Sequence, residues 1–221
     1  MEGLLVDLAK TALLDVAALF PIVNPVGNAP IFLSLTRGAS TETRRLLARR
    51  IAVNGLILLV VSMLVGTYIL AFFGISLPVV QVGGGLVLTA TGWSLLTRKD
   101  EDASTEGAIR PTDRDLLQQS FYPLTLPLTV GPGSLSVAVT LGANAPRRAG
   151  QGVALVVASV LAAAVIGLAV YLSYRWSDRL ERWLGESAMS VFLRLSSFIL
   201  LCIGVQILWN GVRALWLTLP H

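Results

Sequence analysis

Long apolar runs are the feature of this chain that most limits what it can fold into. Six runs, each about as long as a membrane span, lie between polar segments, at residues 13–36, 51–72, 76–97, 116–142, 150–173 and 188–209. A helix needs about 20 apolar residues to cross a hydrocarbon core of about 30 Å. Only 14% of the residues are charged, whereas soluble domains carry about 25%. We therefore expect an all-α membrane protein with six transmembrane helices.

Two of these runs are interrupted by prolines at matched positions. The interruptions are FPIVNPVGNAP, residues 20–30, and YPLTLPLTVGP, residues 122–132. Three prolines of the first segment each recur 102 residues later; the pairs are Pro21 and Pro123, Pro25 and Pro127, and Pro30 and Pro132. Proline inside a helix costs about 3 kcal/mol, because it removes a donor and clashes with the preceding turn. The matched spacing predicts an internally duplicated protein in which helices 1 and 4 are broken by Pro and Gly.

The polar segment 98–115 separates a first three-helix repeat, residues 1–97, from a second one, residues 116–221. An odd number of spans in each half gives the halves opposite orientations, which makes an inverted-topology repeat. The loops after the first, third and fifth runs hold 12 basic residues, and the other side holds 4. Basic loops favour the cytoplasm. We therefore expect 98–115 to be a cytoplasmic linker and both termini to lie outside.

The two breaks leave backbone N–H and C=O groups without helical partners. At membrane depth such groups are tolerated only inside protein or along a polar cavity, so we expect the breaks to meet near the bilayer midplane. Helix N-termini attract carboxylates and C-termini attract cations. Asn28 is the expected cap of the helix after the first break, and another helix should start near Gly131 and Pro132. Paired breaks of this kind can hold a zwitterion, and water, Na⁺ or another anion would also fit.

The expected substrate-binding residues either break the helices or add polar groups beside the breaks. They are Asn24, Pro25, Gly27, Asn28, Thr125, Thr129, Gly131, Gly133 and Ser134. The alternative is that these polar groups only satisfy the broken backbone. Asp15 and Arg194 are charged residues inside apolar runs, where charge often marks function. Asp15 is either interfacial or a coupling site for H⁺ or Na⁺, and Arg194 either snorkels to the interface or contacts substrate.

Composition disfavours several classes of function. The runs contain no histidine, one cysteine (Cys202) and almost no carboxylates, so we expect neither an enzyme nor a metal site or other cofactor. No GxxxxGK[ST] motif occurs, which disfavours ATP-driven transport. The net charge of +4 follows from basic loops and does not indicate nucleic-acid binding. The expected partners are a small-molecule substrate and membrane lipid. Small residues such as Gly83, Gly84 and Gly85 favour close helix packing and permit a homo-oligomer.

The segments FPIVNPVGNAPIFLSLT and YPLTLPLTVGPGS resemble the MarC family, also called UPF0056, and the resemblance covers nearly the whole chain. The family pattern falls on Asn24, Pro25, Gly27, Asn28 and Pro30, and on Pro123, Pro127, Gly131, Pro132 and Gly133. Arg194 also matches a basic position, whereas Gln81 stands where the family often has a basic residue.

The resemblance implies a multi-pass protein of a prokaryotic cytoplasmic (inner) membrane. Some members of the family are described as transporters of small neutral amino acids such as glycine and alanine, and the family resembles the LysE-type exporters. The implied function is therefore secondary transport of small neutral amino acids by alternating access. A channel or passive small-solute carrier, and a lipid or phospholipid carrier, are the alternatives.

Overall fold

The computed structural model describes residues 2–36, 38–97, 112–144 and 152–217, and every regular element in these ranges is helical. In chain order the elements are α1 (Glu2–Val23), α2 (Pro25–Leu35), α3 (Thr41–Phe72), α4 (Leu77–Thr97), α5 (Asp113–Gln118), the π-helical segment η2 (Leu124–Thr129), α6 (Pro132–Asn144), α7 (Gly152–Arg175) and α8 (Ser177–Trp216). The expected all-α class is confirmed. Residues 98–111 of the predicted linker lie outside the described residues, and 113–115 form the start of α5.

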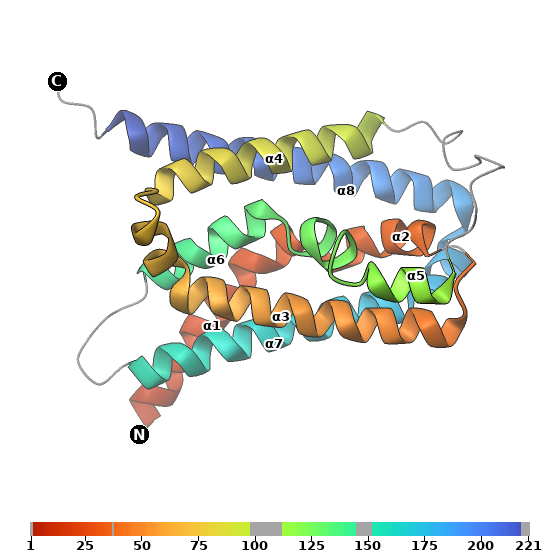
Figure 1. Cartoon of the computed structure of the whole chain (residues 1–221), viewed down its shortest axis with the longest axis horizontal. Helices are drawn as coiled ribbons and strands as arrows, with labels where there is room; N and C mark the ends of the chain where they lie inside the picture. The colour runs from red at the N-terminus through yellow and green to blue at the C-terminus, as the bar shows by residue number, and fades with distance from the viewer. Residues whose placement is uncertain (1, 37, 98–111, 145–151, 218–221) are drawn as a thin grey trace.

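Four of the described helices are long and apolar enough to cross a membrane: Thr41–Phe72, Leu77–Thr97, Val156–Arg175 and Arg194–Trp216. The other two predicted spans, 13–36 and 116–142, are the ones that carry the breaks, and they consist of shorter pieces. The first is α1 followed by α2, and the second is α5, η2 and α6. Figure 1 shows α2 and α5 lying along the long axis of the four spans and α1 crossing it obliquely, with the start of α1 and the end of α8 on the same side.

The long helices begin and end where local chemistry allows it. Ser40 caps α3, because its side chain accepts a hydrogen bond from the N–H of Thr43. Thr112 and Asp115 form a reciprocal capping box at the start of α5. Within α8, Gly185 has a φ of 73° and interrupts the helix, a conformation that glycine adopts at little cost. The predicted sixth span, 188–209, therefore follows a short first segment of α8.

Helices from the two halves of the chain pack against each other. α4 lies along α8, and α3 packs against α7 and α6, while α1 and α2 both contact α7. The contact between α4 and α8 is close enough to require glycine. A methyl group on Gly85 would lie 2.5 Å from the backbone nitrogen of Leu208, so only hydrogen fits there. Gly84 is also buried, whereas a methyl group on Gly83 would meet nothing within 4 Å. The predicted packing role thus holds for two of the three glycines.

The main apolar core is formed by residues of α1, α2, α3 and α7 together with residues of α5, α6 and the second break. It includes Leu19, Phe32, Ile51, Leu124 and Ile166, all of which are almost completely buried. Large apolar side chains also cover much of the outer surface, among them Phe72, Trp93 and Val153. An apolar exterior of this kind is what a lipid-facing helix requires. Within the two breaks, Val23, Asn28, Thr125 and Thr129 are buried inside the protein, whereas Pro21 and Pro127 are exposed.

Candidate functional site

The first break is confined to one residue. α1 continues through Pro21 to Val23, Asn24 adopts the left-handed conformation with φ 45° and ψ 60°, and α2 begins at Pro25. The side-chain oxygen of Asn24 accepts a hydrogen bond of 3.1 Å from the N–H of Gly27. The prediction that Asn28 caps this helix is therefore wrong. Asn24 caps it, because its left-handed backbone returns the side chain over the first turn, and Pro25 at the first position needs no acceptor.

Asn28 instead joins the two breaks. Its side-chain nitrogen donates to the carbonyl oxygen of Val23 at 2.8 Å and to that of Leu128 at 3.2 Å. The first carbonyl ends α1 and the second belongs to η2 in the other break. Only 6% of the Asn28 surface is exposed, so both bonds lie inside protein. The two breaks contact each other, as the sequence predicts.

The second break is longer and depends on hydroxyl groups. Leu126, just before Pro127, has non-helical angles of φ −115° and ψ 123°, as expected for a residue that precedes proline. Thr125 donates through Oγ1 to the carbonyl of Ser120 at 2.7 Å, and Thr129 donates to that of Leu124 at 2.7 Å. Both threonines are buried. Both hydroxyls therefore bond to carbonyls within or beside the second break, and the Ser120 carbonyl also accepts from the peptide N–H of Thr125 at 3.1 Å. This favours an architectural role for these two residues.

The start of α6 is different, because it retains unused donors. The helix begins at Pro132, with Gly133 and Ser134 in its first turn, as expected. Neither of their peptide N–H groups finds an acceptor among the described residues. The hydroxyl of Ser136 is fully buried and likewise has no partner there. Ser136 lies three residues after Gly133 and so shares its face, tilted toward the start of the helix. Such a helix start suits a carboxylate.

The approach of α4 limits the room at this helix start. A methyl group on Gly84 would lie 3.0 Å from the carbonyl oxygen of Pro132 and 3.2 Å from Cβ of Ser136. One on Gly133 would lie 3.0 Å from a methyl carbon of Leu88. Any group that binds at the start of α6 must therefore be small.

Two residues of neighbouring helices, which were not predicted from the sequence, form hydrogen bonds to the second break. Tyr174 of α7 is fully buried, and its ring stacks on Phe32 with 4.4 Å between centroids. Its hydroxyl lies 2.8 Å from Oγ1 of Thr129, and it is the donor because the Thr129 hydroxyl already donates to Leu124. Asn54 of α3 donates to Oγ1 of Thr125 at 3.5 Å. Each is a polar residue within or at the end of a predicted apolar run, and this pattern could have identified both residues from the sequence.

The two charged candidates lie apart from the direct contacts between the breaks. Asp15 is on α1, nine residues before Asn24, or about 13 Å along the helix. It is 6% exposed, and its carboxylate has no hydrogen bond or ion pair with any other described residue. Arg194 is exposed and is the first residue of the apolar span in α8. Its position at the end of that span is typical of a snorkelling arginine.

A third charged residue, Arg44, forms hydrogen bonds at the C-terminal end of α2. Its Nε donates to the hydroxyl of Thr36 at 3.2 Å, and its Nη2 donates to the Thr36 carbonyl at 3.2 Å. The same guanidinium pairs with the carboxylate of Asp178 at the start of α8. This end of α2 is eleven residues from the break, or about 16 Å of helix. Arg44 therefore anchors α2 to α8 at a distance from the candidate site.

Comparison with known proteins gives consistent matches over nearly the whole chain. The family described as "MarC family integral membrane protein" matches residues 10–216. A UPF0056 membrane protein of Archaeoglobus fulgidus is 31% identical over 197 residues, 88% of each chain. The UPF0056 membrane protein YvbG of Bacillus subtilis is 27% identical over 200 residues, covering 90% of this chain and 92% of the relative. The UPF0056 inner membrane protein MarC of Escherichia coli O1:K1 is 27% identical over 214 residues, with 94% and 96% covered. No solved structure matches the chain.

Proposed function

Because this chain belongs to the MarC family of integral membrane proteins, we propose that it is a secondary transporter of small neutral amino acids. The proposed substrate is a zwitterion of the size of glycine or alanine, bound where the two helix breaks meet. The similarity of this chain to the LysE-type exporters is part of the same proposal. The inner-membrane relatives support a place in the cytoplasmic membrane, and the protein acts without catalytic chemistry, metal or other cofactor.

One observation carries the proposal. The first turn of α6 presents the N–H groups of Gly133 and Ser134, and beside them the buried hydroxyl of Ser136, with no acceptor or partner among the described residues. In a hydrocarbon environment each unsatisfied polar group costs several kcal/mol. An α-carboxylate would satisfy all three donors and would also be favoured by the positive end of the helix dipole.

The other end of a zwitterion finds acceptors at the end of α1. Pro25 has no N–H group, so the carbonyl of Pro21 lacks its normal helical donor. Carbonyls at a helix C-terminus attract an ammonium group. Asn28 supports this assignment, because its side chain holds the end of α1 against the second break. The close approach of Gly84 and Leu88 to the start of α6 favours a substrate with a small side chain.

The transport cycle that we propose alternates access between two inverted three-helix halves, 1–97 and 116–221. Contacts between the halves support this cycle. The second predicted span, in α3, packs on the fifth, in α7, and the third, in α4, packs on the sixth, in α8. The excess of basic residues in three loops supports an orientation with both termini outside. Asp15, a carboxylate buried within α1, is the proposed coupling residue for H⁺ or Na⁺.

Counterflow in proteoliposomes tests the proposal. Vesicles loaded with unlabelled L-alanine should accumulate labelled L-alanine transiently. Unlabelled glycine and L-alanine should compete in the outer solution, whereas D-alanine should not. A channel would equilibrate the label without transient accumulation and without stereoselectivity. Absence of counterflow by protein whose folding is verified by its thermal unfolding would exclude an amino-acid carrier.

A further inference from the structure

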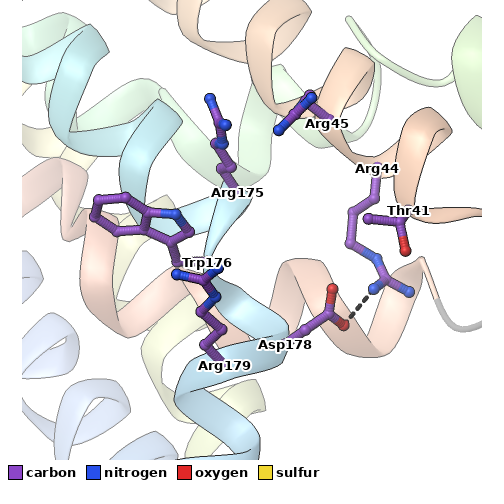
Figure 2. Close-up of a pocket in the computed structure, with 7 residues that line it drawn as sticks. All are labelled: Thr41, Arg44, Arg45, Arg175, Trp176, Asp178 and Arg179. Atoms are coloured by element: carbon purple, nitrogen blue, oxygen red, sulfur yellow. Dashed lines mark hydrogen bonds and ion pairs between the residues drawn. The ribbon is translucent and has the colours of Figure 1, made fainter.

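A basic pocket opens at the end of the bundle where α3 begins and α7 passes into α8. Its volume is about 510 Å³, within the range of about 300–1,000 Å³ typical of small-ligand sites. Figure 2 shows Arg44 and Arg45 entering it from α3, and Arg175 and Arg179 entering it from the α7–α8 junction. Among the described residues, four guanidinium groups from two parts of the chain therefore line the pocket.

The charge of this pocket is only partly balanced. Asp178 is the carboxylate in its lining, and it pairs with Arg44. Arg175 is held by Tyr171, because it donates to the Tyr171 hydroxyl at 2.6 Å and lies over the ring. Arg45 and Arg179 are exposed, and their guanidinium groups have no ion pair with any described residue. Among the described lining residues, four arginines against one aspartate leave a formal charge of +3, which an anion would offset.

The depth of the pocket indicates where such an anion comes from. Arg175 is the last residue of the apolar span Val156–Arg175, so the pocket lies at the level where this span leaves the hydrocarbon. Trp176 follows it and is 47% exposed, as is typical of tryptophan at a membrane interface. Lipid phosphates lie at the same level. Basic pockets between membrane helices are known to receive anionic head groups, and guanidinium forks bind phosphate oxygens in pairs.

We propose that this pocket binds the phosphate group of an anionic phospholipid. Arg45 and Arg179 contact the phosphate from opposite sides of the pocket, and Trp176 packs beside the start of the acyl chains. Arg44 forms the wall next to α2, since it holds Thr36 and Asp178. The site is at the far end of α2 from the helix breaks, so the proposal depends on the pocket and not on the nature of the transported solute.

Lipid binding by the purified full-length protein in detergent tests this inference. Native mass spectrometry would measure the affinity for phosphatidylglycerol, with phosphatidylcholine as the uncharged comparison. The pocket variant is Arg45→Gln with Arg179→Gln. The matched control is Arg49→Gln with Arg114→Gln, which removes the same charge from exposed arginines of α3 and α5 that do not line the pocket.

We expect the pocket variant to bind phosphatidylglycerol about 30-fold more weakly, because one basic residue near an anionic lipid surface corresponds to about a fivefold change in affinity. The control should bind it as the unmodified protein does. A variant with lysine at positions 45 and 179 keeps the charge but loses the paired hydrogen bonds, and it should bind with intermediate affinity. Thermal unfolding in detergent checks that each variant is folded.

Three results would overturn the inference. The first is a pocket variant that binds phosphatidylglycerol no more weakly than the control does, whether because neither variant loses affinity or because both lose it equally through a general effect of surface charge. The second is phosphatidylcholine binding as tight as phosphatidylglycerol binding. The third is stabilisation by inorganic phosphate that depends on Arg45 and Arg179 while phosphatidylglycerol has no such effect, which would assign the site to a soluble phosphate.

Discussion

Replacement of Ser136 by alanine separates a binding role from a structural one. The Ser136 hydroxyl is fully buried and has no partner among the described residues. Leaving a buried polar group unsatisfied costs about 1–3 kcal/mol, so its removal should leave the stability of the protein unchanged or raise it. If the hydroxyl donates to a substrate carboxylate, the bond contributes about 1.5–3 kcal/mol, because hydrogen bonds to charged groups are the strong ones. The affinity for L-alanine should then fall by about 10- to 150-fold.

The assay is L-alanine counterflow measured over a range of substrate concentrations, together with thermal unfolding in detergent. The chain contains a matched control. Ser159 on α7 also has a fully buried hydroxyl without a described partner, so Ser159→Ala makes the same chemical change outside the breaks. We expect a raised KM in the first variant only, with no loss of stability in either. A wild-type KM for Ser136→Ala, or the same rise in KM for both variants, would refute the assignment of the substrate carboxylate to the start of α6.

Three other predictions concern packing, coupling and pH. Gly85→Ala should lower the thermal unfolding temperature, because its methyl group would lie 2.5 Å from a backbone atom of α8. Gly83→Ala is the control, because its methyl group meets nothing within 4 Å, and it should leave the unfolding temperature unchanged or slightly higher. Equal effects of the two substitutions would contradict the packing argument. Asp15→Asn should retain counterflow but lose uptake driven by a pH or Na⁺ gradient, and gradient-driven uptake that persists would exclude Asp15 as the coupling residue. At the start of α5, the hydrogen bond from the Thr112 side chain lowers the pKa of the Asp115 carboxyl below 3.8. The stabilisation that this carboxylate provides is therefore present above its unfolded pKa, near 4, and is lost as pH falls through its lower folded value. The protection factors of the α5 amides, which correct for the intrinsic slowing of exchange in acid, should fall in that acidic range in the unmodified protein but not in Asp115→Asn. An identical pH profile of protection in both proteins would exclude the carboxylate as the cause.

The positions of the helix breaks could be predicted from local chemistry, but their internal structure could not. Proline cannot donate a hydrogen bond, so interruptions were expected within these segments, and they occur at Asn24 before Pro25 and at Leu126 before Pro127. Pro21 and Pro30 nevertheless lie inside α1 and α2. The start of α6 at Pro132 followed in the same way. The choice of cap did not follow, since Asn24 and Asn28 are both good capping residues. A left-handed backbone at Asn24 decided it, and Asn28 was then free to reach the other break.

The sequence by itself determined that the chain is an all-helical membrane protein, because about twenty consecutive apolar residues have few other stable environments. It also determined the two segments within which the backbone is irregular, because proline acts locally, although Pro21 and Pro30 remain inside helices. Only the tertiary structure decided which polar groups are used and which are left over. The hydroxyls of Thr125 and Thr129 are consumed by carbonyls of their own break, whereas that of Ser136 is not. The same holds for the basic pocket. Its two pairs of arginines come from segments more than a hundred residues apart in the chain, and the pairs meet only because α3 packs on α7. Such pairings depend on contacts between distant segments, and no local pattern of residues encodes them.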